Sequence, residues 1–304
     1  MTQPPPAMRQ PCSALPDQAQ HSGSPPSFSL SPLASQLKHA RQPVSVVLIT
    51  LNAASALGAC LDSVRFADEI LVVDSGSQDD SIALAERYGA RVIHQDWLGF
   101  GRQKQYAVTQ AKHDWVLCLD ADERLSPELR TSIEAALSQP AAQVYRLARC
   151  NYFLGRYLRH GEGYPDWNIR LFNRRYARWS DDSVHEHVLS EVAPASLHGD
   201  LLHESAESLS RYLEKQNRYT SLAANAAFAS GKTHSSRRLR VRLLLSPSLR
   251  FIRLYFFRLG FLDGIPGLIH CVIACFNSFS KYAKLIELAH DAEQNTQKTS
   301  KEKT

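Results

Sequence analysis

The sequence predicts an α/β fold in which helices cover both faces of a mostly parallel sheet, followed by a helical C-terminal region. Short apolar runs rich in β-branched residues alternate with helix-like segments from residue 44 onward. Continuous apolar strands of this kind are typical of parallel sheets that are buried on both faces. Beyond residue 206 helical patterns replace the strand signals. With 304 residues, of which 44% are apolar, the chain can bury a core of that size.

The two ends of the chain are expected to be disordered. Residues 1–42 contain eight of the fifteen prolines together with many serines and glutamines. Such a composition buries too little apolar surface to offset the entropy of ordering the chain. Residues 291–304 form a second polar tail. Between the tails we expect a first domain over residues 43–205 and a helical region over residues 206–290.

Each element of the first domain has its own signal. Four buried strands are predicted, at residues 44–50, 69–75, 90–95 and 115–120. Helices are predicted between them, at residues 55–64, 81–89 and 101–111. A fourth helix should begin after Ser126, which is a favoured capping residue and precedes a proline at the first helical position. Residues 144–180 are aromatic and basic with Gly and Pro, which predicts strands and loops that complete a mixed sheet.

The C-terminal region is apolar and basic. Residues 249–288 are strongly apolar, but their longest uncharged stretch, residues 264–280, is slightly short for a transmembrane helix. In a helix, Arg250, Arg253 and Arg258 would fall within an arc of about 140°. This pattern favours an amphipathic element lying in the plane of a membrane surface. The alternative is a buried C-terminal pair of helices.

The charge distribution indicates contact with phosphate groups. The net charge is only +5, but residues 215–262 contain no Asp or Glu and many arginines. A cationic block of this kind suits nucleic acid or an anionic membrane face.

The six cysteines show no metal-finger spacing, and those in apolar patterns are typical of core residues. We therefore expect reduced thiols and a cytoplasmic location.

Three acids directly after the fourth predicted strand are the strongest chemical signal. Asp120, Asp122 and Glu123 would repel one another unless they met a cation or open water. Hard divalent ions such as Mg²⁺ or Mn²⁺ take oxygen ligands, commonly one or two carboxylates together with substrate phosphates. A strand-end Asp-x-Asp therefore suggests a metal–diphosphate site. The alternative is a solvated acidic turn in front of a helix, whose dipole favours acids.

Other polar residues should lie near these acids. Asn52 and Asp74 also follow ends of predicted strands. In parallel sheets ligands bind beyond the carboxyl ends of the strands, so these side chains should converge.

Three other nucleotide-binding or phosphate-handling folds fit the sequence poorly. The first strand is followed by no Gly-x-Gly-x-x-Gly, residues 230–238 imitate only the end of a P-loop, and an aspartyl nucleophile would normally follow the first strand.

The order of these motifs is similar to that of a known family. "VSVVLITLNAA", "EILVVDSGSQDDS" and "WVLCLDADE" resemble the inverting glycosyltransferases of family 2, which have the nucleotide-sugar-binding GT-A fold. "YPDWNIRLFNRR", "VHEHV", "LLHESAESLSRYLEKQNRY" and "LGFLDGIPG" resemble the bacterial lipopolysaccharide core β-1,4-glucosyltransferases. The similarity covers roughly residues 44–290. One departure is Gly163, preceded by Glu162, where the family pattern would place an aromatic residue before Tyr164.

The resemblance implies a donor site for a UDP-sugar. Thr50, Asn52 and Asp74 would line the uridine pocket, with Asp74 accepting a hydrogen bond from the uracil or ribose. The alternative for Asp74 is a turn-forming aspartate that binds its own backbone. Lys104 would lie near the nucleotide, although a surface helix lysine is an alternative. Asp120 would contact the ribose.

The resemblance also implies a divalent cation, Mg²⁺ or Mn²⁺, that neutralises the diphosphate leaving group. Asp122 would hold the metal, and His203 would complete its coordination or contact the diphosphate. Arg170 would bind the diphosphate, since arginine suits bidentate phosphate contact. Trp167 would pack against a sugar or base. A strand with Arg170 and Trp167 pointing outward, and a structural His203, are the simpler alternatives.

An inverting transfer needs a general base on the acceptor side, and the resemblance assigns this role to Glu186. One alternative is a strand on which His185 and His187 share a face and Glu186 points the other way. Another is a zinc pair formed by the two histidines, which would need further ligands. The resemblance implies transfer of a hexose, glucose, to inner-core heptose of lipopolysaccharide. The enzyme would be peripheral on the inner face of the inner membrane and would bind no nucleic acid. Polyprenyl phosphate or another glycan is an alternative acceptor, and a non-catalytic membrane adaptor an alternative function.

Overall fold

The computed structural model describes residues 41–182, 186–205, 208–230 and 236–301. Most of the N-terminal segment predicted to be disordered lies outside the described residues. The same holds for His185 and for most of the P-loop-like segment, residues 230–238.

Four parallel strands form one half of a mixed nine-stranded sheet, in the order β3-β2-β1-β4. Their bounds are β1 (Val44–Thr50), β2 (Glu69–Asp74), β3 (Arg91–His94) and β4 (Trp115–Asp120). Apart from Ser45 and the polar residues at their ends, these strands are apolar, because helices cover both faces of the sheet. The predicted parallel sheet is therefore confirmed, with strand bounds within a residue or two of those expected.

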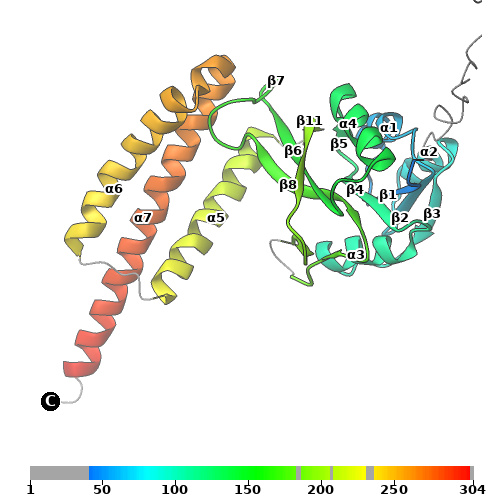
Figure 1. Ribbon diagram of the computed structural model, residues 1–304. Helices are drawn as coiled ribbons and strands as arrows, with labels where there is room; N and C mark the ends of the chain where they lie inside the picture. Colours follow the sequence, from blue (N-terminus) through cyan, green and yellow to red (C-terminus); the bar gives the residue numbers. More distant parts are fainter. Residues whose placement is uncertain (1–40, 183–185, 206–207, 231–235, 302–304) are drawn as a thin grey trace, which may run out of the picture. The chain divides into compact units, whose positions relative to one another are not determined.

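Helices lie on both faces of this half of the sheet (Figure 1). They are α1 (Ala54–Ser63), α2 (Ser81–Arg87), α3 (Phe100–Gln110) and α4 (Pro127–Ser138). Alternate residues of β1 pack in opposite directions: Val46 and Leu48 contact the core under α1, α2 and α4, whereas Val47 faces the core under α3. Ser126 caps α4 as predicted, since its side chain accepts a hydrogen bond from the Leu129 N–H at 3.2 Å.

The second half of the sheet is mixed, as the aromatic and basic segment predicted. β8 joins β4 antiparallel, β6 follows β8 antiparallel, and β11 runs parallel to β6. The bounds are β6 (Val144–Phe153), β7 (Arg156–Tyr157), β8 (Asp166–Asn173) and β11 (Ala195–His203). β9 (Ala177–Trp179) and β10 (Val188–Ser190) pair antiparallel in a separate two-stranded sheet. A short strand that was not predicted, β5 (Glu123–Leu125), pairs with β11 directly after the acidic motif.

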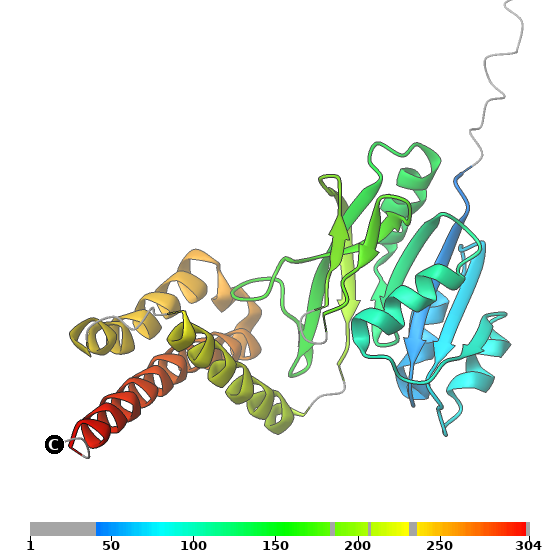
Figure 2. The same ribbon diagram turned by 90° about the horizontal axis from the view of Figure 1, so that it is seen from below.

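The C-terminal region consists of helices (Figures 1 and 2). They are α5 (Leu209–Ala229), α6 (Ser236–Phe251), the π-helical turn η2 (Ile252–Phe257), the short 3₁₀ turn η3 (Gly260–Asp263) and α7 (Gly264–Lys301). α7 packs against both α5 and α6. α7 continues to Lys301, within the segment where the sequence predicted a polar tail from residue 291.

A buried aspartate fastens the turn between α6 and α7 to the sheet domain. Asp263 is 1% exposed and accepts hydrogen bonds from the backbone N–H groups of Arg159 and His160, at 3.0 and 2.8 Å. The His160 ring nitrogen Nδ1 lies 3.0 Å from its other oxygen. The helical region is thus held by specific polar contacts to the loop after β7.

The surface of the α6–η2–η3–α7 hairpin is unusually apolar. Its large exposed apolar side chains include Leu244, Leu249, Phe257, Ile265 and Phe276, all more than 60% exposed. One stretch, residues 260–292, is long and apolar enough to cross a membrane, judged by length and composition alone. The alternative of a buried helix pair does not account for this exposure.

Candidate functional site

The ends of β1 and β2 are joined by a polar network. β-sheet register places Thr50 opposite Asp74, and the Thr50 hydroxyl donates a hydrogen bond to the Asp74 carboxylate at 2.8 Å. Asn52 has a positive φ of 51°, and its side-chain oxygen accepts a hydrogen bond from the Gln78 N–H at 2.8 Å. Ser77 links the two loops, because its hydroxyl accepts from the Asn52 N–H and donates to Asp74. The three residues predicted to hold uridine therefore do converge.

The contacts of Asp74 also agree with the alternative interpretation, in which it is a turn-forming aspartate. It is 1% exposed and accepts hydrogen bonds from the backbone N–H groups of Gly76 and Ser77, at 2.9 and 2.8 Å. Burial alone would raise the pKa of this carboxyl, but the hydrogen bonds from Ser77, Thr50 and Gly76 lower it. Asp74 is therefore an ionised residue that shapes the loop around the site, and its contact with uridine stays a prediction.

A lysine joins two acids that lie far apart in the sequence. The Lys104 ammonium lies 2.9 Å from an Asp120 oxygen and 3.4 Å from a Glu186 oxygen. Lys104 is only 7% exposed, and its Nζ lies 4.8 Å from the centre of the Trp179 ring. The alternative of a surface helix lysine is therefore wrong. α3, the end of β4 and the loop before β10 meet at this one cation.

Arg170 compensates the charge of the acidic motif from the other side. Its Nη2 donates to Asp120 at 2.9 Å and to Glu123 at 2.7 Å. Arg170 and Glu123 are both buried, at 3% and 0% exposure, so Arg170 does not point out from its strand. Glu123 also accepts a hydrogen bond from the Asp120 N–H at 3.0 Å, which fixes the turn after β4.

These contacts keep the site ionised. Burial would raise the pKa of Asp120, but the positive charges of Arg170 and Lys104 outweigh it and hold the pKa well below its usual range. For Arg170, burial opposes the charged form, whereas Glu123 and Asp120 favour it, and its pKa is raised above the ordinary value. Asp120 is thus a permanent carboxylate with an exposed edge, suited to accept hydrogen bonds from a ligand hydroxyl.

A cavity of about 1010 Å³ opens over these groups. Five predicted residues line it: Lys104, Asp120, Trp167, Arg170 and Glu186. The Trp167 side chain is 40% exposed, and the Arg146 guanidinium lies 4.8 Å from the centre of its ring. A flat exposed ring beside a buried cluster of charges is a suitable surface for a sugar or a base.

Several lining residues were missed by sequence reasoning. Trp179 is packed between Lys104 and Arg170, and α5 contributes four further residues to the lining: Lys215, Arg218, Tyr219 and Leu222. Their spacing of three, one and three residues places the four α5 side chains on one face of the helix. That spacing was a usable signal, whereas nothing in the sequence brings α5 to the sheet.

A close approach of two backbones positions Glu186. A Cβ atom added at Gly101 in α3 would lie 2.3 Å from the Ser180 carbonyl oxygen and 3.4 Å from the Glu186 Cβ. Real Cβ atoms do not approach a backbone atom that closely. Gly101 therefore lets the segment that carries Glu186 lie against α3, where Lys104 meets it.

Asp122 and His203 form a separate pair on the other side of the turn. The His203 Nε2 lies 3.3 Å from an Asp122 oxygen. The His203 Nδ1 lies 2.8 Å from the Asn151 side-chain oxygen, so Nδ1 donates in that contact while Nε2 faces Asp122. Asp122 also lines a smaller cavity of about 360 Å³ beside α1.

This pair fits two ligands of one divalent ion. Neighbouring ligands at about 2.1 Å from an octahedral metal lie about 3 Å apart, close to the observed separation. Within the described ranges, no group of three His, Cys, Asp or Glu residues is arranged to hold a metal. Phosphate oxygens and water would have to supply the remaining ligands, as is usual for Mg²⁺.

Comparison with known proteins identifies the family. Residues 45–190 match the model of the family described as glycosyl transferase family 2. The chain is 31% identical to the lipopolysaccharide core biosynthesis glycosyltransferase LpsC of Rhizobium meliloti, over 81% of this chain and 92% of that protein. The chain belongs to glycosyl transferase family 2. The family resemblance expected from the sequence is thereby confirmed, and the mixed α/β architecture agrees with the expected fold class.

A second relative covers this family 2 glycosyltransferase to a similar extent. An uncharacterized glycosyltransferase of Rickettsia typhi is 31% identical over 81% of this chain and 87% of its own length. Among solved structures, glucosyl-3-phosphoglycerate synthase of Mycobacterium tuberculosis, in complex with Mn²⁺, UDP and glucosyl-3-phosphoglycerate, is 25% identical with a TM-score of 0.31. That match spans 38% of this chain and 45% of the synthase.

Proposed function

We propose that this chain is an inverting, metal-dependent transferase that moves a hexose, glucose, from a UDP-sugar to the heptose of a lipopolysaccharide inner core. The observation that carries the proposal is the bridge from Asp120 through Lys104 to Glu186 inside one large cavity. It brings a nucleotide-side carboxylate and a carboxylate of an acceptor-side loop to the same space. The similarity to LpsC supports a lipopolysaccharide core as the acceptor.

Each group has a task in this reaction. Asp120 accepts hydrogen bonds from the ribose, and the Trp167 ring covers the sugar. Arg170 keeps Asp120 ionised and adds positive charge beside the diphosphate. Asp122 and His203 would hold the divalent ion, which acts as a Lewis acid on the leaving diphosphate. Thr50, Asn52 and Asp74 shape the uridine end of the site.

Glu186 acts as the general base. Its carboxylate takes the proton of the attacking acceptor hydroxyl, while the acceptor oxygen attacks the anomeric carbon opposite the diphosphate. Lys104 holds the carboxylate in place at 3.4 Å and balances its charge. Positioning of this kind matters because small displacements of reacting groups lower rates steeply.

The metal is tested by Asp122→Asn. We expect UDP to protect the wild-type chain against thermal unfolding more strongly when Mn²⁺ is present, because Asp122 and His203 would hold the cation that neutralises the diphosphate. In Asp122→Asn this extra protection by Mn²⁺ should be lost and the turnover should fall at least tenfold. Asp291→Asn, which changes an exposed acid of α7, is the control. An unchanged Mn²⁺ effect in Asp122→Asn would rule out this metal site.

The close approach at Gly101 is tested by Gly101→Ala. The added methyl group must push Ser180, Asp182 and Glu186 away from α3, because a Cβ here would meet all three. This displacement separates Glu186 from Lys104. We expect kcat to fall about 100-fold, with UDP-sugar binding retained. Gly58→Ala is the matched control, because an added Cβ in α1 would meet its nearest atoms at 3.9 Å or more. Equal kcat values for the two variants would contradict this positioning role.

Polyprenyl phosphate or another glycan is an alternative acceptor to the lipopolysaccharide core. Glu162 and Gly163, where the sequence departs from the family pattern, lie in the loop that leads into β8. This loop contacts the basic helical region through the ion pair of Glu162 with Arg250. Product masses after incubation with purified core oligosaccharide or with polyprenyl phosphate distinguish the acceptors. A complete lack of metal-stimulated UDP-sugar hydrolysis or transfer would favour the non-catalytic adaptor.

The apolar and basic helical region supports a location at the membrane surface, on the inner face of the inner membrane where a lipid-linked acceptor is made. The exposed apolar side chains of the α6–α7 hairpin would enter the interface between headgroups and acyl chains. This function requires no binding to nucleic acid.

A further inference from the structure

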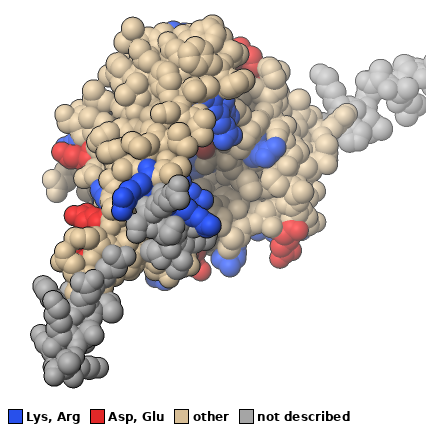
Figure 3. All heavy atoms as spheres, turned by 90° about the vertical axis from the view of Figure 1, so that its left-hand side faces the viewer, with Lys and Arg blue, Asp and Glu red and all other residues tan. Residues whose placement is uncertain are grey.

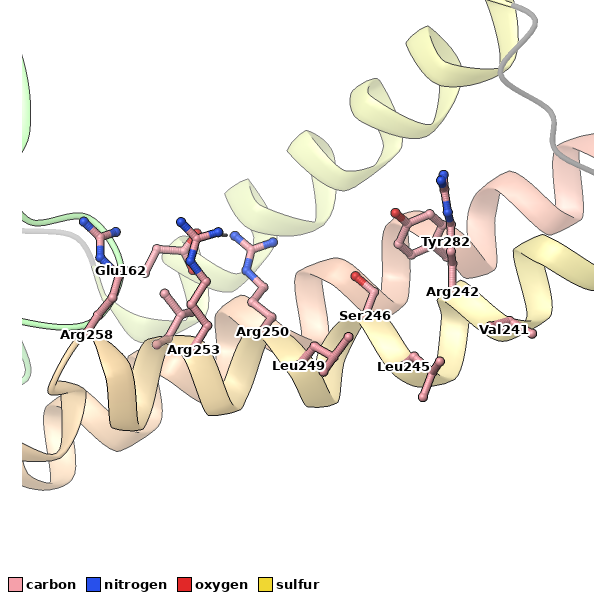
Figure 4. A pocket seen from close by; sticks show the side chains of 11 residues that line it. Glu162, Val241, Arg242, Leu245, Ser246, Leu249, Arg250, Arg253, Arg258 and Tyr282 are labelled. Carbon is pink, nitrogen blue, oxygen red and sulfur yellow. Dashed lines mark hydrogen bonds and ion pairs between the residues drawn. The ribbon is translucent and has the colours of Figure 1, made fainter.

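A second large cavity lies outside the proposed catalytic site. It has a volume of about 770 Å³ and is lined by α6, η2, one residue of α7 and Glu162 of the sheet domain. Figure 4 shows that Arg250, Arg253 and Arg258 point to the same side of the helix, toward Glu162. We call this cavity the arginine groove. Arg242 lies farther along α6 on its lining.

The arginine groove carries excess positive charge. Four guanidinium groups face it, and the one carboxylate among its lining residues, Glu162, forms an ion pair with Arg250. The side chains of Arg242 and Arg253 make no hydrogen bond or ion pair with any described part of the chain, and both residues are exposed. Among the described residues, the Arg258 side chain makes only a long hydrogen bond of 3.4 Å to the Tyr164 carbonyl oxygen. These groups are therefore available to an anion.

The surroundings of the groove are apolar. Leu245 and Leu249 line it and are 54% and 63% exposed, and Phe257 at the end of η2 is 80% exposed. Figure 3, which views this end of the molecule, shows a band of Lys and Arg side chains below a broad surface with few charges. A soluble phosphate ion would need only the arginines. An anion with attached hydrocarbon chains uses both features, since its phosphate meets arginine and its chains cover leucine and phenylalanine.

We infer that the arginine groove is a binding site for the phosphate of an anionic membrane phospholipid. The groove would set the depth of the helical hairpin, with guanidinium groups at the level of the phosphates and the leucines below them. Because Arg250 contacts Glu162 and Asp263 fastens the hairpin to the loop after β7, a lipid bound here also orients the sheet domain on the membrane. This inference rests on the proposed function only for the identity of the membrane.

The test is vesicle co-sedimentation of the full chain with phosphatidylcholine alone and with phosphatidylcholine containing 30 mol% phosphatidylglycerol, a fraction of about one third chosen to mimic an anionic leaflet. We expect binding to the anionic vesicles only. Arg242→Gln combined with Arg253→Gln should weaken it about 25-fold, because each arginine near an anionic surface contributes about fivefold. Both side chains are exposed, so the variant should fold normally.

The matched control is Arg238→Gln combined with Arg240→Gln, which removes the same charge from exposed positions of α6 outside the groove. Binding that falls equally in both double variants would mean diffuse attraction and would overturn the inference. So would equal binding of the wild-type chain to neutral and anionic vesicles. Glu162→Gln should strengthen binding, because it removes the only carboxylate of the groove, and weaker binding would contradict the inference.

Two further measurements separate the possible ligands and the two proposals. Protection against thermal unfolding by inorganic phosphate alone, without vesicle binding, would indicate a site for a soluble anion and overturn the lipid inference. UDP protection in the presence of Mn²⁺ should be unchanged in the Arg242/Arg253 double variant. Failure of UDP to protect the wild-type chain would count against the proposed function and leave the vesicle result unaffected.

Discussion

Glu186→Gln is expected to lower kcat by a factor of about 10² to 10⁴, the usual contribution of a general base. Glutamine keeps the size and the hydrogen-bonding oxygen of the side chain but cannot take a proton from the acceptor hydroxyl. Binding of the UDP-sugar should be nearly unchanged, because Asp120 and Arg170 keep their mutual contact at 2.9 Å. The measurement is the steady-state rate of transfer together with UDP-sugar protection against thermal unfolding.

Glu191→Gln is the control for this experiment, since Glu191 is an exposed acid just after β10. A normal kcat in Glu186→Gln would reject Glu186 as the base. A combined loss of transfer and of UDP-sugar binding would instead mean that Glu186 holds the donor site together through Lys104. The two outcomes are distinguishable because binding and turnover are measured separately.

Arg170→Met is expected to lower the free energy of unfolding by about 3–5 kcal/mol, the usual cost of removing one partner of a buried ion pair. Methionine fills much of the space but leaves Glu123, which is 0% exposed, with its nearest remaining cationic group at 3.7 Å, on Arg149. Asp120 would keep only Lys104 as a close cation, at 2.9 Å. The measurement is chemical denaturation followed by circular dichroism.

The control is Arg175→Met, which removes an exposed ion pair with Asp114 and should cost at most about 1 kcal/mol. The double variant Arg170→Met with Glu123→Gln should recover part of the lost stability, because the uncompensated buried charge is removed as well. Equal stability of Arg170→Met and the wild-type chain would contradict the structural role of this pair.

The strands and helices of the first domain were predictable because their signals are local. A run such as residues 115–120 is apolar throughout and ends at an aspartate, so both its burial and its end are visible in the sequence. The cap at Ser126 is equally local, since a hydroxyl and the N–H three residues later form the contact. β5 was missed because three residues carry too little pattern, and their pairing with β11 involves residues about 80 positions away.

The residues of the candidate site likewise include some that local sequence signals revealed and others that only the tertiary structure brought together. The acidic motif was visible because neighbouring acids in a sequence repel one another unless a cation or water is close. The family resemblance then supplied roles for the residues around the motif. The burial of Lys104 was not visible, because a lysine on an amphipathic helix is usually at the surface and its partners lie 16 and 82 residues away. Trp179 and the α5 residues were missed for the same reason. The polar residues after 290 suggested a tail, whereas α7, which packs against α5 and α6, runs on to Lys301.

By itself, the sequence determined the first four strands with their helices, the acids at the strand ends and the apolar, arginine-rich character of the C-terminal helices, because each depends on residues a few positions apart. The tertiary structure decided which charges meet. It buried Lys104 and Arg170 beside Asp120, paired Asp122 with His203, and gathered four arginines of one hairpin around a single carboxylate. The physical reason is that an ion pair is set by distance in space, and that distance exists only after the sheet and helices have packed.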